Sequence, residues 1–86
     1  MAGLIEEITE RFDLPAETAG LPKVTITGGR QVLVENHKGL LEYSGEQIEI
    51  NGGRLRVRIR GTGLELRAMS RELVLVTGQI FGVDME

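Results

Sequence analysis

The residues best suited to chemistry in this 86-residue chain lie in one short polar stretch between two apolar segments. Residues 34–45 hold the only histidine, His37, and the only tyrosine, Tyr43. A histidine can act as a general base or as a metal ligand. A metal site needs three or four converging ligands, however, and the chain has neither cysteine nor a second histidine. His37 is therefore interpreted as a turn residue whose side chain hydrogen-bonds within the bend, and an acid–base role is the alternative.

A row of arginines is the second candidate for function. Arg54, Arg56, Arg58 and Arg60 alternate with apolar residues, so all would project from one face of a strand at intervals of about 6.6–6.8 Å. Such a stripe could bind phosphate groups or another anionic ligand. The face has no aromatic residues for base stacking, which disfavours nucleic acid. Acidic residues are also predicted on the neighbouring strands, and they favour a charge-paired face exposed to water: Glu49 opposite Arg56 and Glu65 opposite Arg58.

The composition limits the classes of protein to consider. A length of 86 residues allows one domain, residues 1–86, and the net charge of −3 gives no overall attraction to nucleic acid or anionic membranes. Without cysteine there is no disulfide and no thiolate metal site, so a reducing compartment is expected. No stretch resembles a signal peptide or approaches about 18 consecutive apolar residues. We expect a soluble, cytoplasmic protein without a cofactor.

The first part of the chain has a helical pattern. Apolar residues at positions 4, 5, 8 and 12 form one helical stripe. Pro15 disfavours a helical conformation at the residue before it and sets the predicted helix end near Asp13. A connector bracketed by Pro15 and Pro22 follows. Residues 1–22 are therefore predicted to be a short helix and a connector.

From residue 23 to the end, apolar and polar residues alternate with a period of two, which is typical of half-buried strands. Turn residues divide this region into about eight short segments. The sequence thus predicts an all-β fold, a small antiparallel β-sandwich built mostly from up-and-down hairpins. A partly closed barrel is one alternative. A β-solenoid is another, because strand centres recur about every eight residues.

Three turns set the predicted pairing of these strands. Asn36 and Gly39 tolerate the positive φ of a tight reversal, and Gly52-Gly53 and Gly61-Thr62 suit two-residue hairpin turns. The last strand, residues 80–85, would then be an open edge. The predicted opposite pairs are Val34 with Leu41, Ile50 with Leu55, and Ile59 with Leu64.

A second set of apolar residues points away from the main apolar face in this arrangement. Another layer, the N-terminal helix or another subunit must cover them. Because four apolar side chains of the helix are too few, we expect a protein–protein interaction surface and self-association, with a homodimer as the simplest form. The residues of this predicted surface are Leu33, Leu40, Val74, Val76, Phe81 and Val83.

Several motifs together resemble the YabP/YqfC family of sporulation proteins, on the YqfC side. They are Asp13-Leu14-Pro15, Leu21-Pro22-Lys23-Val24-Thr25, Val34-Glu35-Asn36-His37-Lys38-Gly39-Leu40-Leu41-Glu42-Tyr43-Ser44, and Glu72-Leu73-Val74-Leu75-Val76-Thr77-Gly78-Gln79-Ile80. The resemblance implies a small, soluble, β-rich protein of endospore-forming bacteria, without known enzymatic activity or cofactor. It also implies a role in the mother cell or the spore envelope, with a sporulation membrane protein at the forespore membrane as a partner.

Overall fold

The computed structural model describes residues 20–86, and the predicted N-terminal helix lies outside the described residues. In this described part, six strands form one continuous antiparallel sheet in the order β1-β2-β6-β5-β4-β3. Four strands are short, and the last two form one long hairpin. The strands are β1 Lys23–Thr27, β2 Gln31–Glu35, β3 Leu40–Tyr43, β4 Gln47–Asn51, β5 Arg56–Met69 and β6 Leu73–Met85.

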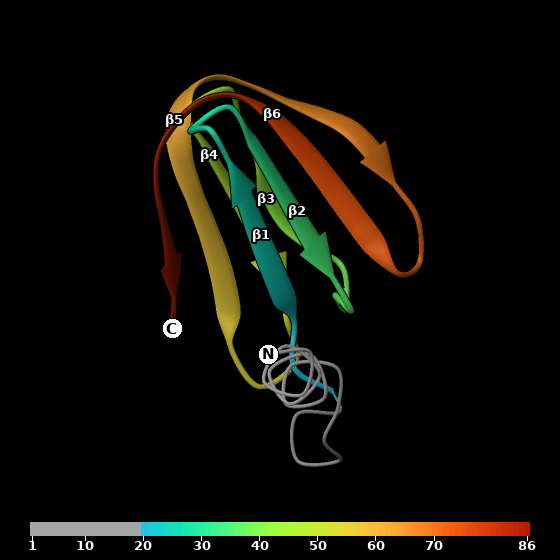
Figure 1. Cartoon of the computed structure of the whole chain (residues 1–86). Coiled ribbons are helices and arrows are strands. Elements are labelled where there is room, and N and C mark those ends of the chain that lie inside the picture. Colours follow the sequence, from blue (N-terminus) through green and yellow to red (C-terminus); the bar gives the residue numbers. More distant parts are fainter. Residues whose placement is uncertain (1–19) are drawn as a thin grey trace, which may run out of the picture.

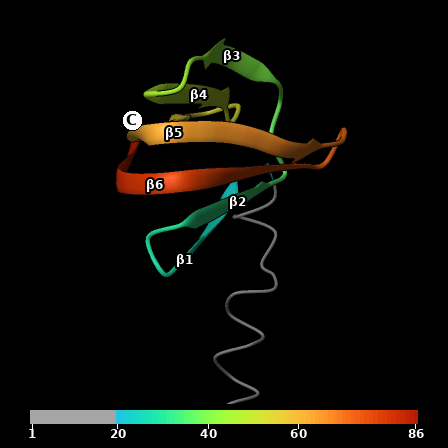
Figure 2. The same ribbon diagram turned by 90° about the horizontal axis from the view of Figure 1, so that it is seen from above.

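The sheet folds over on itself because β5 and β6 bend together (Figure 1). Residues 73–77 of β6 pair with β2, whereas residues 56–60 of β5 pair with β4. The long hairpin thus joins a front layer, which contains β1 and β2, to a back layer, which contains β3 and β4. Figure 2 shows these two pairs on opposite sides of the β5–β6 hairpin.

Glycines and bulges allow the bend in the hairpin. The β5–β6 register shifts between Arg60 and Gly61 and again before Glu65, and such bulges increase the local twist and bend of a strand. A Cβ atom on Gly61 would collide with the carbonyl oxygen of Gln79. Gly78 has a φ of 141°, which disfavours any residue with a side chain. The bend therefore depends on residues without a Cβ.

The core lies between the two layers. Val32 and Val34 of β2 contribute from the front layer, and Ile48 and Ile50 of β4 contribute from the back layer. Within residues 20–86, the buried side chains of the hydrophobic core are all aliphatic, which suits two closely spaced layers. Its buried members are Val32, Val34, Ile48, Ile50, Val57, Ile59, Leu64, Val74 and Val76.

The all-β, antiparallel prediction is confirmed, but the finer architecture differs. The predicted hairpin turn at Gly61-Thr62 is instead part of β5, and Thr77-Gly78 is part of β6. Two pairs of predicted strands are therefore single bent strands, which leaves six strands in one folded sheet instead of about eight in a sandwich. The uniformly antiparallel pairing of the described strands also rules out the solenoid alternative for this region.

The predicted registers are wrong for related reasons. Asn36 and Gly39 do have positive φ, of 63° and 127°, but the chain there crosses from the front to the back layer. Strands β2 and β3 therefore do not pair. The β4–β5 connection is longer than two residues, so Ile50 lies opposite Val57, not Leu55.

Candidate functional site

His37 is buried where the β2–β3 connection meets the β5–β6 turn. Its Nδ1 accepts a 2.9 Å hydrogen bond from the backbone N–H of Gly39, which leaves Nε2 to donate to the carbonyl oxygen of Ser70 at 2.7 Å. The first bond stabilises the bend, as the sequence predicted. The second bond ties together two segments 33 residues apart. With both ring nitrogens engaged, the imidazole has no free position for a substrate proton or a metal ion.

A shallow cavity of about 550 Å³ opens beside this histidine. Its lining comes from the two connections just described and from the end of β5. Among residues 20–86, no carboxylate lines this cavity to act with His37, and the other charged residues there are Lys38 and Arg71. No cluster of three or more potential metal ligands occurs within residues 20–86.

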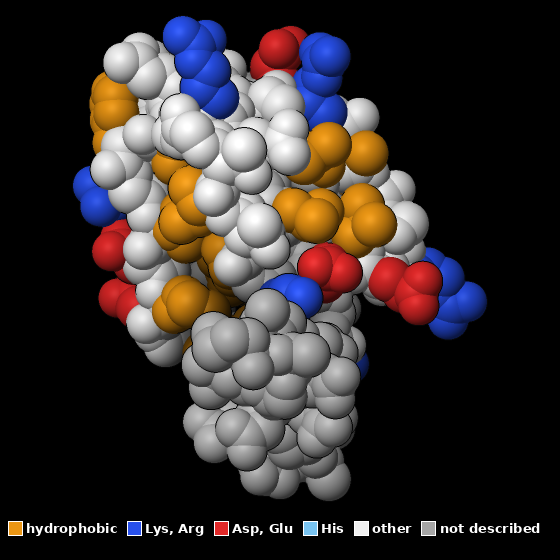
Figure 3. Space-filling model, in the orientation of Figure 1, with side chains coloured by type: hydrophobic (Ala, Val, Ile, Leu, Met, Phe, Trp, Pro, Cys, Tyr) orange, Lys and Arg blue, Asp and Glu red, His pale blue; other side chains and the backbone are white. Residues whose placement is uncertain are grey.

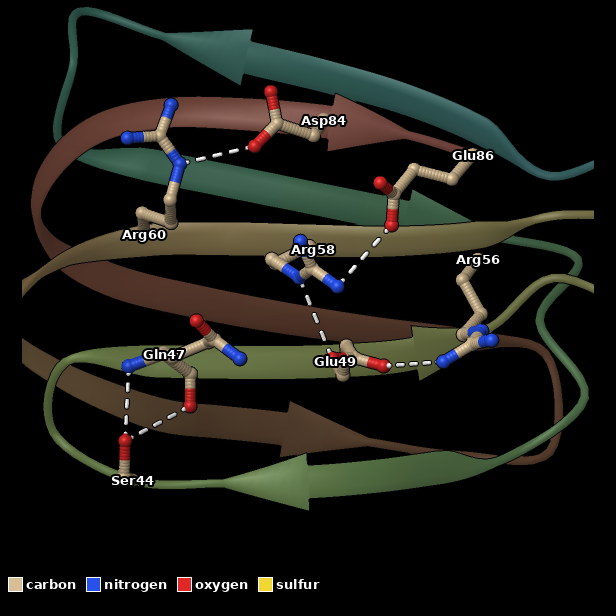
Figure 4. Close-up of polar contacts among 8 residues, drawn as sticks. All are labelled: Ser44, Gln47, Glu49, Arg56, Arg58, Arg60, Asp84 and Glu86. Carbon is tan, nitrogen blue, oxygen red and sulfur yellow. Dashed lines mark hydrogen bonds and ion pairs between the residues drawn. The ribbon is translucent and has the colours of Figure 1, made fainter.

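Three arginines of the row, Arg56, Arg58 and Arg60, lie on the outer face of the back layer and are paired with acids (Figure 4). Glu49 on β4 is buried and contacts two arginines, Arg56 at 3.2 Å and Arg58 at 3.4 Å. Arg58 also contacts Glu86 at 3.1 Å. The predicted pairing of Glu49 with Arg56 is thus present, although the residue directly opposite Glu49 is Arg58. The predicted position of Glu65 opposite Arg58 is wrong, because Glu65 lies opposite Thr77.

The other two arginines of the row differ in position. Arg60 pairs with Asp84 of β6 at 3.0 Å and lies over Gly82, where a Cβ atom would collide with the guanidinium group. Arg54 precedes β5 and is exposed in the loop after β4. An anionic ligand that bound the strand portion of the row would have to compete with carboxylates for Arg56, Arg58 and Arg60.

The six residues of the predicted interaction surface divide into three groups. Val74 and Val76 are fully buried in the core, because β6 pairs with β2 and turns them toward the back layer. They therefore cannot contribute to a surface. Leu40 and Val83 are half-buried against the core, and Leu33 is half-buried on the outside of the front layer. Phe81 alone of the six is exposed, at 62%.

Several exposed apolar side chains lie near strand ends or on the outermost strands of the sheet. Figure 3 shows orange side chains in separate groups over the left and the right of the view. Phe81 and Met85 lie at the end of β6, and Leu41 lies on β3, the outermost strand of the back layer. The large exposed apolar residues within the described part are Ile26, Leu41, Tyr43, Met69, Phe81 and Met85.

The C-terminal part of β6 has a free edge. Residues 73–77 have β2 on one side and β5 on the other, whereas residues 79–85 pair with β5 alone within the described part of the chain. The N–H of Ile80 still donates a 2.8 Å bond to the carbonyl of Gly29 in the β1–β2 turn. The sequence predicted that the last strand lies at the edge of the sheet, but in the observed strand order β6 lies between β2 and β5. For residues 81–85, however, the backbone is an edge.

Tyr43 links the edge strand β3 of the back layer to the front-layer part of β5. No pattern in the sequence indicates this contact. The hydroxyl of Tyr43 on β3 accepts a 3.3 Å hydrogen bond from the N–H of Leu66 on β5. Nearby, the N–H of Leu64 donates to the carbonyl of Gly45 at 2.9 Å. The two layers are thus linked on this side. On the other side, the unpaired strand edges within residues 20–86 are those of β1 and of the end of β6, and the end of β6 carries the more exposed apolar side chain, Phe81.

Comparison with known proteins adds a family relationship. A family model described as the YabP family matches residues 19–86. The chain is also 27% identical over 74 residues to "Uncharacterized protein YqfC" of Bacillus subtilis (strain 168), a match that covers 85% of this chain and 80% of that protein. No solved structure matches. Within residues 20–86, no helix is long and apolar enough to cross a bilayer.

Proposed function

Because this chain belongs to the YabP family, we propose that it is a non-enzymatic interaction module that works in bacterial sporulation. The sporulation role follows from the family resemblance of its sequence. The module acts by presenting a surface to other proteins during mother-cell or spore-envelope development. It needs no cofactor for this role.

The free edge of β6 is the observation that supports this function most strongly. Phe81 and Met85 are exposed there, at 62% and 49%, beside backbone that has one strand neighbour within residues 20–86. Exposed apolar side chains next to unpaired strand backbone are the features to which another polypeptide adds by β-augmentation. The expected partner is therefore a protein that supplies a strand or an apolar face.

The polar clusters support a non-enzymatic function. Both nitrogens of His37 are used in bonds to the backbone, so it lacks the free base that acid–base catalysis requires. The arginines of β5 are paired with carboxylates, which weakens the case for binding nucleic acid or another anion. These contacts are typical of side chains that hold a sheet together.

We place this activity in the cytoplasm of the mother cell. The resemblance suggests recruitment to the forespore membrane by a sporulation membrane protein, without insertion of this chain into the bilayer. The same surface is expected to support self-association, and the membrane partner would dock on the assembled form.

Replacement of Phe81 tests this function in a sporulating host that lacks its own copy of the gene. Phe81→Glu places a charge at the contact and is expected to reduce the yield of resistant spores at least tenfold, about the effect of a 1.4 kcal/mol loss of binding. Leu41→Glu is the matched control, because Leu41 is also exposed, at 52%, but lies on the opposite edge of the back layer. Immunoblots must show equal protein levels. Normal spore yield with Phe81→Glu at that level would refute the proposed use of this edge.

A further inference from the structure

We propose that a second copy of this chain pairs with the free edge of β6, antiparallel about a two-fold axis at Val83. This inference rests on the proposed function, because it assigns a partner to the same surface. It would extend the back layer of each copy into one sheet that crosses the interface, with the two β6 strands at its centre.

The backbone of β6 determines which residues can pair with a partner. Glu86 and Arg56 exchange both of their backbone hydrogen bonds, at 2.8 and 3.0 Å. Backbone groups alternate in direction along an antiparallel strand, so those of Asp84 also face β5. The N–H and C=O groups of Val83 and Met85 therefore face the free edge. The bulge at residues 81–82 interrupts this alternation and limits the edge to a short segment.

Charge then selects the register of the two copies. A two-fold axis at Asp84 would place its carboxylate directly opposite the same carboxylate of the second copy, which is destabilising. An axis at Val83 instead places Asp84 opposite Gly82 of the other copy. Arg60 lies over that glycine, so each carboxylate would meet a guanidinium group of the other copy in addition to its own 3.0 Å partner.

The apolar side chains agree with this register. Val83 lies opposite Ile59 and Met85 lies opposite Val57 within the chain, so both side chains share the face of the core. With the axis at Val83, each Met85 lies across from Phe81 of the other copy. Two positions whose apolar side chains are about half exposed or more in the single chain would then be neighbours at the interface. The contact is self-complementary, as a two-fold interface requires.

Sedimentation of the full chain at micromolar concentration gives the first test. The wild type is expected to sediment at twice 9.4 kDa. Val83→Pro removes the N–H that faces the second copy while keeping the bonds to β5, and it should sediment as a single chain. Phe81→Glu should do the same, and the control Leu41→Glu should keep the doubled mass. Circular dichroism must show that each variant is folded.

Disulfide cross-linking tests the register, and the natural chain contains no cysteine to interfere. Val83→Cys should form a covalent dimer on mild oxidation, because directly opposite residues have Cα atoms about 5.5 Å apart. Phe81→Cys or Met85→Cys alone should remain uncross-linked, and a mixture of these two variants should cross-link. Self-cross-linking of Phe81→Cys, in place of this pattern, would contradict the assigned axis.

These outcomes separate the inference from the proposed function. A wild type that sediments at 9.4 kDa at every concentration overturns the dimer, whether residues 1–19 cover the edge or nothing does. If Phe81→Glu then still abolishes sporulation, the proposed function stands with a different partner. If Val83→Pro is a single chain in solution and sporulates normally, the dimer exists but the proposed function does not depend on it.

Discussion

At the scale of single residues, His37 connects two segments that the sequence keeps far apart. Replacement by alanine would leave the N–H of Gly39 and the carbonyl of Ser70 without their partner. A buried polar group that loses its partner costs about 1–3 kcal/mol, so we expect His37→Ala to lower the free energy of unfolding by about 2–3 kcal/mol. Urea denaturation measures this change.

A graded control accompanies the alanine variant. The side-chain amide of His37→Gln can reach the position of Nε2 and keep the bond to Ser70, so its cost should be about half as large. A surface turn residue would cost under about 1 kcal/mol in either variant. Equal, negligible losses for both variants would show that the bond between the two connections does not contribute to stability.

The paired acids on the back layer give a second prediction at this scale. Glu49 is buried and contacts two arginines, whereas Asp84 is half exposed and contacts Arg60. Exposed ion pairs are usually worth up to about 1 kcal/mol, and charge-assisted bonds at buried sites are worth more. We expect Glu49→Gln to destabilise the protein by about 1–2 kcal/mol and Asp84→Asn by under about 0.5 kcal/mol. Thermal denaturation of both variants gives the order, and a larger loss for Asp84→Asn would contradict this ranking.

Residue types were predictive where the interaction is local. The positive φ of Asn36 and the bend-stabilising role of His37 follow from residues within a few positions of one another. The contacts of Tyr43 with Leu66 and of His37 with Ser70 join segments 23 and 33 residues apart. Such contacts depend on where the layers meet, so no pattern in the sequence could indicate them.

At the scale of elements, the β5–β6 hairpin determines the fold. Period-two patterns correctly located the strand residues, but a glycine in a strand region can form either a turn or a bulge. Gly61 and Gly78 lie within continuous bent strands and do not form hairpin turns. This outcome depends on tertiary structure, because β5 and β6 must change direction while they connect β2 in one layer to β4 in the other. A single sequence does not distinguish these outcomes, and the wrong pairing of Ile59 with Leu64 follows from this ambiguity.

A matched pair of glycine variants tests the importance of the bend. Gly61→Ala would force its Cβ against the carbonyl of Gln79, and we expect a loss of about 2–3 kcal/mol in unfolding free energy. Gly45→Ala is the control, because Gly45 lacks a positive φ and an added Cβ there would meet no atom within 4 Å. Its effect should stay within about 0.5 kcal/mol. Similar denaturation midpoints for both variants would mean that β5 tolerates a side chain at the bend.

At the scale of the whole molecule, the folded sheet has an asymmetric boundary. Tyr43 and the backbone of Gly45 link the layers on one side, and the end of β6 is unpaired within residues 20–86 on the other. Strand β3, the other edge of the back layer, carries a bulge and the charged Glu42, both of which discourage further pairing. Pairing of the β6 ends about a two-fold axis would be closed, so it would not lead to open-ended polymerisation.

Residue-resolved hydrogen exchange across a concentration series tests the pairing of the β6 edge most directly. The amide of Asp84 faces β5 and should be protected at every concentration, which makes it the internal reference. The amide of Val83 faces the free edge, and we predict that its exchange slows at least about tenfold as the concentration rises through the micromolar range. If the Val83 amide exchanges rapidly at all concentrations while Asp84 stays protected, the edge does not pair with a second copy, and the proposed dimer is contradicted.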